Sequence, residues 1–309
     1  MVSPDHGEGN PVPRRPPKVI RPDHAAPFVD PVTVEPVDWI DIVTPDWAWG
    51  GSSGEGVKVA VVDSGIDATH PKVDGVHGYV TIREDDGGQL VYDTEPHIDS
   101  VGHATACASV IRSLAPRCEL YSVKVLGTGN VGSGPVFAAG LRWALNNNMN
   151  VCNLSLGTTK REFFGLFHEL ADRAYFNNVA LITAANNLPF PSFPSLYSSV
   201  ISVASHAVQD PYTFYYNPNP PVEFGALGID VRLAWKNHSH IPATGNSYAA
   251  PHITGLVAKI LGKHPQLTVF QLKTILRQLA ANVGRTQVEQ PPHLLGERRR
   301  EESSHNERP

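Results

Sequence analysis

Short apolar runs alternate with longer amphipathic stretches through the middle of the chain, from about residue 57 to residue 205. The first run, residues 57–62, is rich in valine, which is typical of a strand buried on both faces of a parallel sheet. Similar short runs predict strands at residues 119–126, 151–156, 179–184 and 200–205. The longer stretches predict helices at residues 137–147, 162–177, 248–262 and 268–281. The alternation predicts an α/β fold, with a mostly parallel central sheet flanked by helices on both faces.

The two ends of the chain differ in composition from this central part. Residues 1–30 are rich in Pro, Arg and His, and the run at residues 13–17 (Pro-Arg-Arg-Pro-Pro) is incompatible with a regular helix or a central strand. We expect an extended N-terminal arm there. Residues 31–282 are long enough to form one large domain, and the polar residues 283–309 predict a disordered tail.

Composition and charge argue against several classes of partner and compartment. With 25 basic and 30 acidic side chains, the net charge of −5 argues against nucleic acid as the main partner. Three widely spaced cysteines, without metal-binding spacing, argue against a disulfide framework and favour a reducing compartment. No apolar run reaches membrane-spanning length, and no secretory signal is visible. We therefore expect a cytoplasmic protein with no membrane partner, and leave its oligomeric state open.

Three polar stretches interrupt the pattern at places where chemistry can occur. Asp63 follows the predicted strand 57–62, and loops at strand ends carry sites in α/β folds. His103 precedes a run of small residues that predicts a closely packed helix. Ser247 lies in the frame Gly-x-Ser-x-Ala-x-Pro-His, and Pro251 is expected in the first turn of the helix that follows. Taken singly, these residues are also explained as a turn aspartate, a structural histidine and a helix N-cap.

Taken together, the three stretches resemble the motifs of the subtilisin-like serine protease family. Residues 59–66 are similar to its aspartate motif, and residues 102–105 (Gly-His-Ala-Thr) to its Gly-His-Gly-Thr motif. Residues 245–252 (Gly-Asn-Ser-Tyr-Ala-Ala-Pro-His) resemble its Gly-Thr-Ser-Met-Ala-x-Pro-His motif. The chain order Asp, His, Ser is that of subtilisin. The resemblance extends over residues 37–281 and implies the subtilisin-like fold.

The resemblance implies a role for each matching residue. Ser247 would be the nucleophile, His103 the general base and acid, and Asp63 the residue that orients the imidazole. Residues 184–187 (Ala-Ala-Asn-Asn) are similar to the family's Ala-Ala-Gly-Asn, which implies that Asn187 donates to the oxyanion. The implied activity is that of a serine endopeptidase with a polypeptide substrate. No cofactor and no metal are implied.

The substrate would bind as an added strand between two edges of the chain. Ser155, Leu156 and Gly157 match the segment that pairs with substrate in the family, and Asn130, Val131 and Gly132 match the opposite edge. Main-chain hydrogen bonds then supply most of the affinity, which favours an extended polypeptide.

The sequence departs from the family pattern close to the implied site. Ala104 and Ala106 replace a Gly and a second His, and Asn246 and Tyr248 flank the Ser where Thr and Met are usual. Asn186 replaces a Gly beside the implied oxyanion donor, and because Asn tolerates a left-handed φ better than most residues, the turn can survive. None of these changes removes a reacting group. Two alternatives remain open: a dedicated precursor-processing protease or peptide ligase, and an inactive homologue that binds peptides.

Three other segments carry expectations of their own. Residues 188–193, which should wall the first specificity pocket, are shorter than usual and proline-rich, and the arm at residues 1–30 is a candidate to cover the cleft. Cys107 follows the His by one helical turn, as in the proteinase K-like branch of the family, and would be a target for mercury. Residues 110–114 lack the loop that holds the family's tight calcium ion, so we expect no calcium there.

Overall fold

The computed structural model describes residues 43–284 of the 309-residue chain. The predicted arm lies outside this range, as does the predicted tail from residue 285 onward. The helices are α1 (Pro45–Trp49), α2 (His103–Leu114), α3 (Gly134–Asn146), α4 (Phe164–Phe176), α5 (Asn246–Lys263) and α6 (Val269–Leu279). The strands are β1 (Lys58–Asp63), β2 (Gly78–Glu84), β3 (Leu90–Asp93), β4 (Glu119–Lys124), β5 (Val151–Leu154), β6 (Ala180–Ala184), β7 (Ile201–His206), β8 (Phe214–Tyr216), β9 (Phe224–Leu227), β10 (Val231–Trp235) and β11 (Ser239–Ala243).

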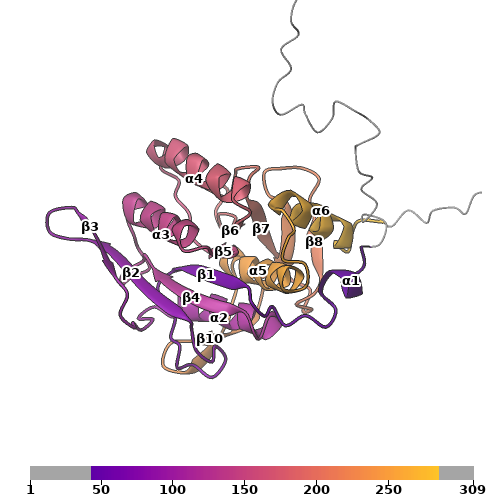
Figure 1. Ribbon diagram of the computed structural model, residues 1–309, viewed down its shortest axis with the longest axis horizontal. Helices are drawn as coiled ribbons and strands as arrows, with labels where there is room; N and C mark the ends of the chain where they lie inside the picture. The colour runs from indigo at the N-terminus through magenta and orange to yellow at the C-terminus, as the bar shows by residue number, and fades with distance from the viewer. Residues whose placement is uncertain (1–42, 285–309) are drawn as a thin grey trace, which may run out of the picture. The chain divides into compact units, whose positions relative to one another are not determined.

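Nine of these strands form one central sheet in the order β3-β2-β4-β1-β5-β6-β7-β9-β8 (Figure 1). The strands from β2 to β9 in this order pair in parallel, and the two outermost strands, β3 and β8, pair antiparallel. A mostly parallel sheet needs helices on both faces, because the crossovers between its strands have to run over the faces. The predicted α/β class and its flanking helices are confirmed.

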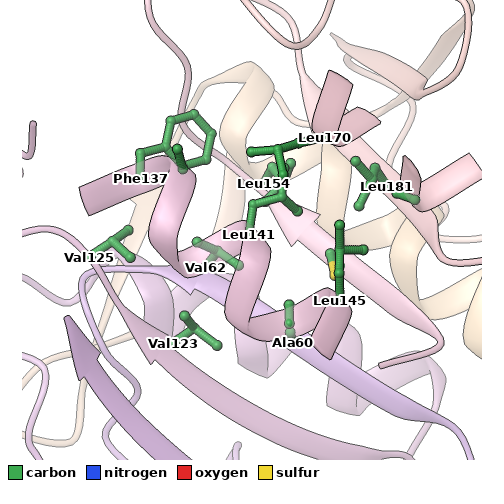
Figure 2. Close-up of a cluster of buried hydrophobic side chains, with 14 of the residues drawn as sticks. Ala60, Val62, Val123, Val125, Phe137, Leu141, Leu145, Leu154, Leu170 and Leu181 are labelled. Atoms are coloured by element: carbon green, nitrogen blue, oxygen red, sulfur yellow. The ribbon is translucent and has the colours of Figure 1, made fainter. Parts of the chain in front are cut away.

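The alternation of side chains along β1 assigns the helices to the two faces. Ala60 and Val62 belong to a fully buried cluster with Phe137 and Leu141 of α3 and Leu170 of α4 (Figure 2). Because successive side chains of a strand point to opposite faces, the neighbouring Val59, Val61 and Asp63 point to the side where α2 and α5 pack. The polar residue at the end of β1 therefore points toward α2.

Helices α2 and α5 pack very closely against each other. At Gly255 of α5, an added Cβ would lie only 2.8 Å from the Cβ of Leu114. The first turns of α2 contribute small buried residues, including Ala104, Ala106 and Ala108. This close approach brings the N-terminal ends of two helices, one carrying His103 and the other Ser247, to the same side of the sheet.

The sheet topology brings the implied site residues to one edge. Asp63 ends β1, Ser155 follows β5, and residues 185–187 follow β6, and these three strands are neighbours in the parallel sheet. The carboxyl ends of parallel strands share an edge, which is where sites form in α/β folds. Within residues 43–284, no helix is long and apolar enough to span a bilayer.

Candidate active site

A buried histidine–aspartate pair lies at the end of β1. His103 Nδ1 lies 2.9 Å from each carboxylate oxygen of Asp63, which is fully buried, while His103 is 8% exposed. An Nδ1–H that donates to a carboxylate leaves Nε2 as the acceptor nitrogen of the neutral ring. Gly102 makes the entry to α2 possible, because its φ of 101° is left-handed and an added Cβ would lie 2.7 Å from the Trp235 ring. The pair thus has the geometry of a base and its orienting group.

Asp99 accepts hydrogen bonds from residues at the start of α2 and so holds this part of the backbone in place. The sequence motifs did not identify it as a site residue. One carboxylate oxygen accepts from Ser64 Oγ at 3.0 Å and from the Gly102 N–H at 2.7 Å. The other accepts from both the N–H and the hydroxyl of Thr105, at 3.0 and 2.7 Å. Ser64 follows Asp63 directly, so this network ties the end of β1 to the start of α2. A signal was present: an Asp four residues before the His, where it can cap a helix.

The pKa of His103 is raised from 6.5 by its acidic neighbours. Burial by itself lowers this pKa, because it disfavours the charged imidazolium. The charge and hydrogen bond of Asp63, together with the charge of Asp99, outweigh burial. The protein therefore stabilises the imidazolium that forms when this ring accepts a proton.

Ser247 lies in the first turn of α5, and the backbone there differs from the expectation. Pro251 lies inside the helix and not in its first turn. A proline has no N–H to donate to the carbonyl four residues before it, which here is that of Ser247. That carbonyl instead accepts from Ser155 Oγ at 2.8 Å, with Cys107 Sγ at 3.5 Å. Partners on β5 and α2 therefore stabilise the unusual proline position.

The Ser247 hydroxyl points toward the loop that follows β5. In the described part of the chain, its hydrogen bond is to the carbonyl of Ser155, at 3.2 Å, and not to His103. Both Ser247 and His103 line the same cleft. Hydrogen bonds between a nucleophile and its base are often long before substrate binds, so this arrangement remains compatible with proton transfer.

Asn187 is oriented by the residue next to the serine. Its Oδ1 accepts from the Asn246 N–H at 2.8 Å, which leaves Nδ2 directed elsewhere and without a partner among the described residues. The Asn246 side chain in turn donates to the carbonyls of Ala185 and Asn186, at 3.2 and 3.1 Å, and accepts from the Ser205 N–H at 2.9 Å. Asn246, a departure from the family pattern, thus connects the start of α5 to the loop carrying the implied oxyanion donor.

The turn at Asn186 forms without the left-handed φ that an asparagine would tolerate. The φ of Asn186 is not among the positive values of the described residues, whereas that of Asn130 is, at 61°. Asn186 instead accepts a hydrogen bond from the Leu188 N–H at 3.1 Å. The turn after β6 is therefore stabilised by side-chain hydrogen bonding, and no left-handed residue is required at this position.

One cleft of about 480 Å³ brings the predicted residues together. Both expected substrate edges line it, as do His103, Ser247 and Asn187; the edge residues are Ser155, Leu156, Gly157, Asn130, Val131 and Gly132. Gly132 approaches the neighbouring backbone closely, since an added Cβ would lie 2.6 Å from the Val125 carbonyl oxygen. Asp63 lies behind His103 and does not line the cleft.

A second hollow of about 440 Å³ lies beside Ser247. It shares the 155–157 edge and Asn187 with the cleft, and its far wall includes Leu188 and Ser192. The wall is connected to the edge by two backbone hydrogen bonds between Thr158 and Phe193, at 2.9 and 2.8 Å. Phe190 is 62% exposed and does not line the hollow. The proline-rich segment therefore forms a rim and leaves the hollow open.

Cys107 lies directly beneath the candidate site. Its Sγ and ligand atoms of Asp63 and His103 lie within 4.8 Å of one another, a spacing that a thiophilic metal ion can bridge. The thiol is fully buried and lies 3.4 Å from Ser155 Oγ. Burial and the charge of Asp63 raise its pKa well above 9, so the group is a neutral thiol.

Helix α2 runs without interruption through residues 110–114, the span that corresponds to the family's calcium loop. Arg112 lies there, and its guanidinium donates to the carbonyls of Val73, Pro116, Cys118 and Gly75 at 2.8, 2.9, 2.8 and 3.2 Å. Backbone carbonyls are also typical calcium ligands. In this protein the positively charged guanidinium of Arg112 binds four backbone carbonyls.

The sheet order and the arrangement of this cleft are similar to those of subtilisin-like peptidases. The chain belongs to the subtilase family. The family's sequence profile matches residues 54–296. The thermostable alkaline protease of Halalkalibacterium halodurans is 30% identical over 245 residues, which cover 76% of this chain and 64% of that protein. Subtilisin Savinase of Lederbergia lenta is 32% identical over 248 residues, covering 76% of this chain and 87% of that protein.

Solved structures agree with this assignment. Sphericase has a TM-score of 0.62 at 25% identity, covering 73% of this chain and 83% of that one. A cold-adapted subtilisin-like serine proteinase has a TM-score of 0.61 at 23% identity, covering 74% and 83%, and so supports the fold alone. The resemblance seen in the sequence motifs is confirmed at the level of the family. The proteinase K-like character of Cys107 stays a prediction. The chain spans slightly less than two thirds of the length of the Halalkalibacterium halodurans protease and of the M-protease of Shouchella clausii.

Proposed function

We propose that this chain is a serine endopeptidase that hydrolyses peptide bonds in extended polypeptides. One observation carries the proposal: the Asp63–His103 pair, at 2.9 Å, lies at a cleft that Ser247 and Asn187 also line. Membership of the subtilase family supports it. A base with a raised pKa, oriented by a buried carboxylate beside a hydroxyl at a helix N-terminus, has the required chemistry.

In the proposed reaction, Ser247 Oγ attacks the scissile carbonyl carbon as its proton passes to His103 Nε2. Asp63 stays ionised and stabilises the imidazolium through Nδ1. The carbonyl oxygen becomes an oxyanion that accepts from Asn187 Nδ2, helped by the partial positive charge at the N-terminal end of α5. As the C–N bond breaks, His103 returns the proton to the leaving amine. Water, activated by the same imidazole, then hydrolyses the acyl-enzyme.

The substrate would lie as a strand between the two edges of the cleft. Residues 155–157 and 130–132 would supply main-chain partners on either side of the peptide. Each residue of the substrate has its own N–H and C=O to pair, so an extended chain binds better than a compact one. This geometry favours unfolded or flexible polypeptide segments over folded proteins.

A fluorophosphonate probe tests the nucleophile directly. We expect the wild-type protein to be labelled, and Ser247→Ala to be neither labelled nor active while keeping its far-UV circular dichroism. His103→Ala should be almost as inactive, because the two residues act as a unit. Asn187→Ala should lower kcat about a hundredfold to a thousandfold, the cost found for the corresponding donor in subtilisin, a member of this family. Substantial hydrolysis by Ser247→Ala would overturn the assignment.

The same experiments separate the alternatives. An inactive peptide-binding homologue would bind peptides but take up no probe. A peptide ligase would be labelled, yet mass spectrometry of its products would show new peptide bonds when an amine acceptor is present. Hydrolysis products alone support the endopeptidase. A dedicated processing protease would cleave only one sequence in a peptide library.

A further inference from the structure

The hollow beside Ser247 and the main cleft meet at one side chain, Lys160. The two cavities share the 155–158 segment, Asn187 and Ser247, and Lys160 lines both of them. Lys160 follows β5 by a few residues and is exposed. Its side chain therefore lies at the junction between the place where a substrate strand would run and the hollow next to the nucleophile.

Lys160 also brings a positive charge to the walls of both cavities. Among the described residues that line the two cavities, it has the only full charge apart from a protonated His103, and no lining residue is acidic. Its ammonium makes no salt bridge or hydrogen bond to any residue within the described range 43–284. The walls nearby offer neutral polar groups, such as the hydroxyls of Thr158 and Ser192. An unpaired cation in such surroundings attracts a carboxylate.

Building on the proposed function, we infer that Lys160 makes the peptidase prefer an acidic residue immediately on the acyl side of the scissile bond. Ser247 and Asn187 line the hollow, whereas His103, which returns the proton to the leaving amine, lines only the main cleft. A side chain that fills the hollow therefore belongs to the substrate residue whose carbonyl is attacked. A Glu or Asp side chain at this position would place its carboxylate beside Lys160.

An acidic side chain beside the wall of the main cleft supports this placement. Glu84 accepts a hydrogen bond from Ser133 Oγ at 3.2 Å, and Ser133 lines the main cleft but not the hollow. The acidic side chain of Glu84 disfavours a substrate carboxylate near Ser133, and Lys160 favours one beside Ser247. The two charges therefore bias an acidic substrate side chain toward the hollow.

Matched peptides test the inference. We would compare kcat/KM for peptides that differ only at the position before the scissile bond, with Glu, its neutral isostere Gln, or Lys. The wild-type protein should prefer Glu over Gln by about fivefold at low salt, as expected for an exposed ion pair of about 1 kcal/mol. The preference should shrink as ionic strength rises, because salt screens the pair.

Two substitutions and one control assign the preference to Lys160. Lys160→Gln should bring the Glu/Gln ratio close to one, and Lys160→Glu should favour the Lys peptide over the Gln peptide. Arg161→Gln is the control, since Arg161 is an exposed neighbouring cation that lines neither cavity, and it should keep the wild-type ratio.

The outcomes distinguish this inference from the proposed function. If fluorophosphonate does not label the protein and no peptide is cleaved, the proposed function fails. If the protein is labelled and cleaves peptides, but the Glu/Gln ratio is near one or is unchanged in Lys160→Gln, only the inference about Lys160 is overturned. A ratio that falls equally in Arg161→Gln would also overturn it, because the effect would then be one of general surface charge.

Discussion

At the scale of single residues, two opposing effects set the pKa of His103: burial lowers it, and the carboxylates of Asp63 and Asp99 raise it. The raised pKa has a direct consequence for activity, because only the neutral ring can accept the Ser247 proton. We predict that kcat/KM for a neutral peptide rises with pH, with an inflection above 6.5. A pH–rate profile from pH 5 to 9 measures this. An inflection clearly below 6.5 would contradict the described balance.

Substitution of Asp99 can show whether this residue only holds the backbone around His103 in place or also affects the pKa of the His103 ring. Asp99 does not contact the ring, but its carboxylate connects Ser64, Gly102 and Thr105 and adds to the charges that raise the pKa of His103. We predict that Asp99→Asn lowers kcat and also shifts the pH inflection downward. A purely structural role would lower the melting temperature or kcat without moving the inflection, and a pH–rate profile of the variant distinguishes the two.

Cys107 makes the site sensitive to thiophilic metals. Its Sγ lies with ligand atoms of Asp63 and His103 inside 4.8 Å, so Hg²⁺ bound to the thiol would disturb the pair. We predict inhibition by stoichiometric Hg²⁺ that is lost in Cys107→Val and retained in Cys118→Val, a second buried free cysteine. Inhibition assays on the three proteins provide the measurement. Equal inhibition of Cys107→Val would show that the metal acts elsewhere.

At the scale of elements, the sequence predicted the strands that are buried on both faces better than the peripheral ones. β1, β5 and β6 consist of buried side chains almost throughout, and their apolar runs were visible. The hairpin of β10 and β11 was missed, because β11 is exposed or half-buried and contains Pro242.

The start of α5 could not be predicted from local rules. Proline is favoured in a first turn, so the sequence placed Pro251 there, whereas the helix begins earlier, at Asn246. The hydrogen bond that Pro251 cannot form is replaced at the Ser247 carbonyl by Ser155, which lies 92 residues away in the chain. Such a tertiary partner is invisible to a local pattern. The motifs pointed to the groups of the proposed reaction, but not to the residues that hold them, such as Asp99.

Arg112 gives a prediction for the stability of α2 and the loops around it. Removing its guanidinium would leave four carbonyls without their charged donor. We predict that Arg112→Met lowers the free energy of unfolding by about 3 kcal/mol. Arg117→Gln, which breaks only an exposed ion pair with Glu55, should cost less than about 1 kcal/mol. Urea denaturation of both variants provides the comparison.

The same arrangement bears on calcium. Because Arg112 already binds these carbonyls, we expect thermal melts with EDTA and with added calcium to coincide nearly. A melting shift of many degrees that calcium reverses would show a calcium site that contributes to stability. Such a shift in the wild type but not in Arg112→Met would place that site close to the arginine.

At the scale of the whole molecule, the site depends on elements that are far apart in the chain but adjacent in the sheet. β1, β5 and β6 bring Asp63, Ser155 and Asn187 to one edge, and α5 adds Ser247 from the C-terminal third of the chain. Loss of global folding therefore removes the site as a unit. Conditions that destabilise the core should abolish activity and tertiary structure together, which makes the pH dependence of folding relevant to function.

Two histidines should make the folded state sensitive to acid. Burial lowers the pKa of both His252 and His97 to about 4, with the nearby charges of His206 and Lys124 acting in the same direction. Between pH 6.5 and 4 the unfolded chain therefore binds more protons, and stability falls as the pH falls through this window. His252 is 4% exposed, so its contribution is roughly 3 kcal/mol. The contribution of His97 to this loss of stability is smaller, because the His97 side chain is only half-buried and solvent reaches it.

The raised pKa of His103 acts in the opposite sense, since it adds stability at low pH that is lost as the pH rises through its folded value. The wild-type slope is therefore a net effect, and His252→Gln isolates one part of it. We predict that urea unfolding between pH 6.5 and 4.5 shows a smaller loss of stability in His252→Gln than in the wild type. His168→Gln, at an exposed position on α4, should keep the wild-type slope. Equal slopes in all three proteins would mean that His252 is protonated as readily in the folded protein as in the unfolded chain.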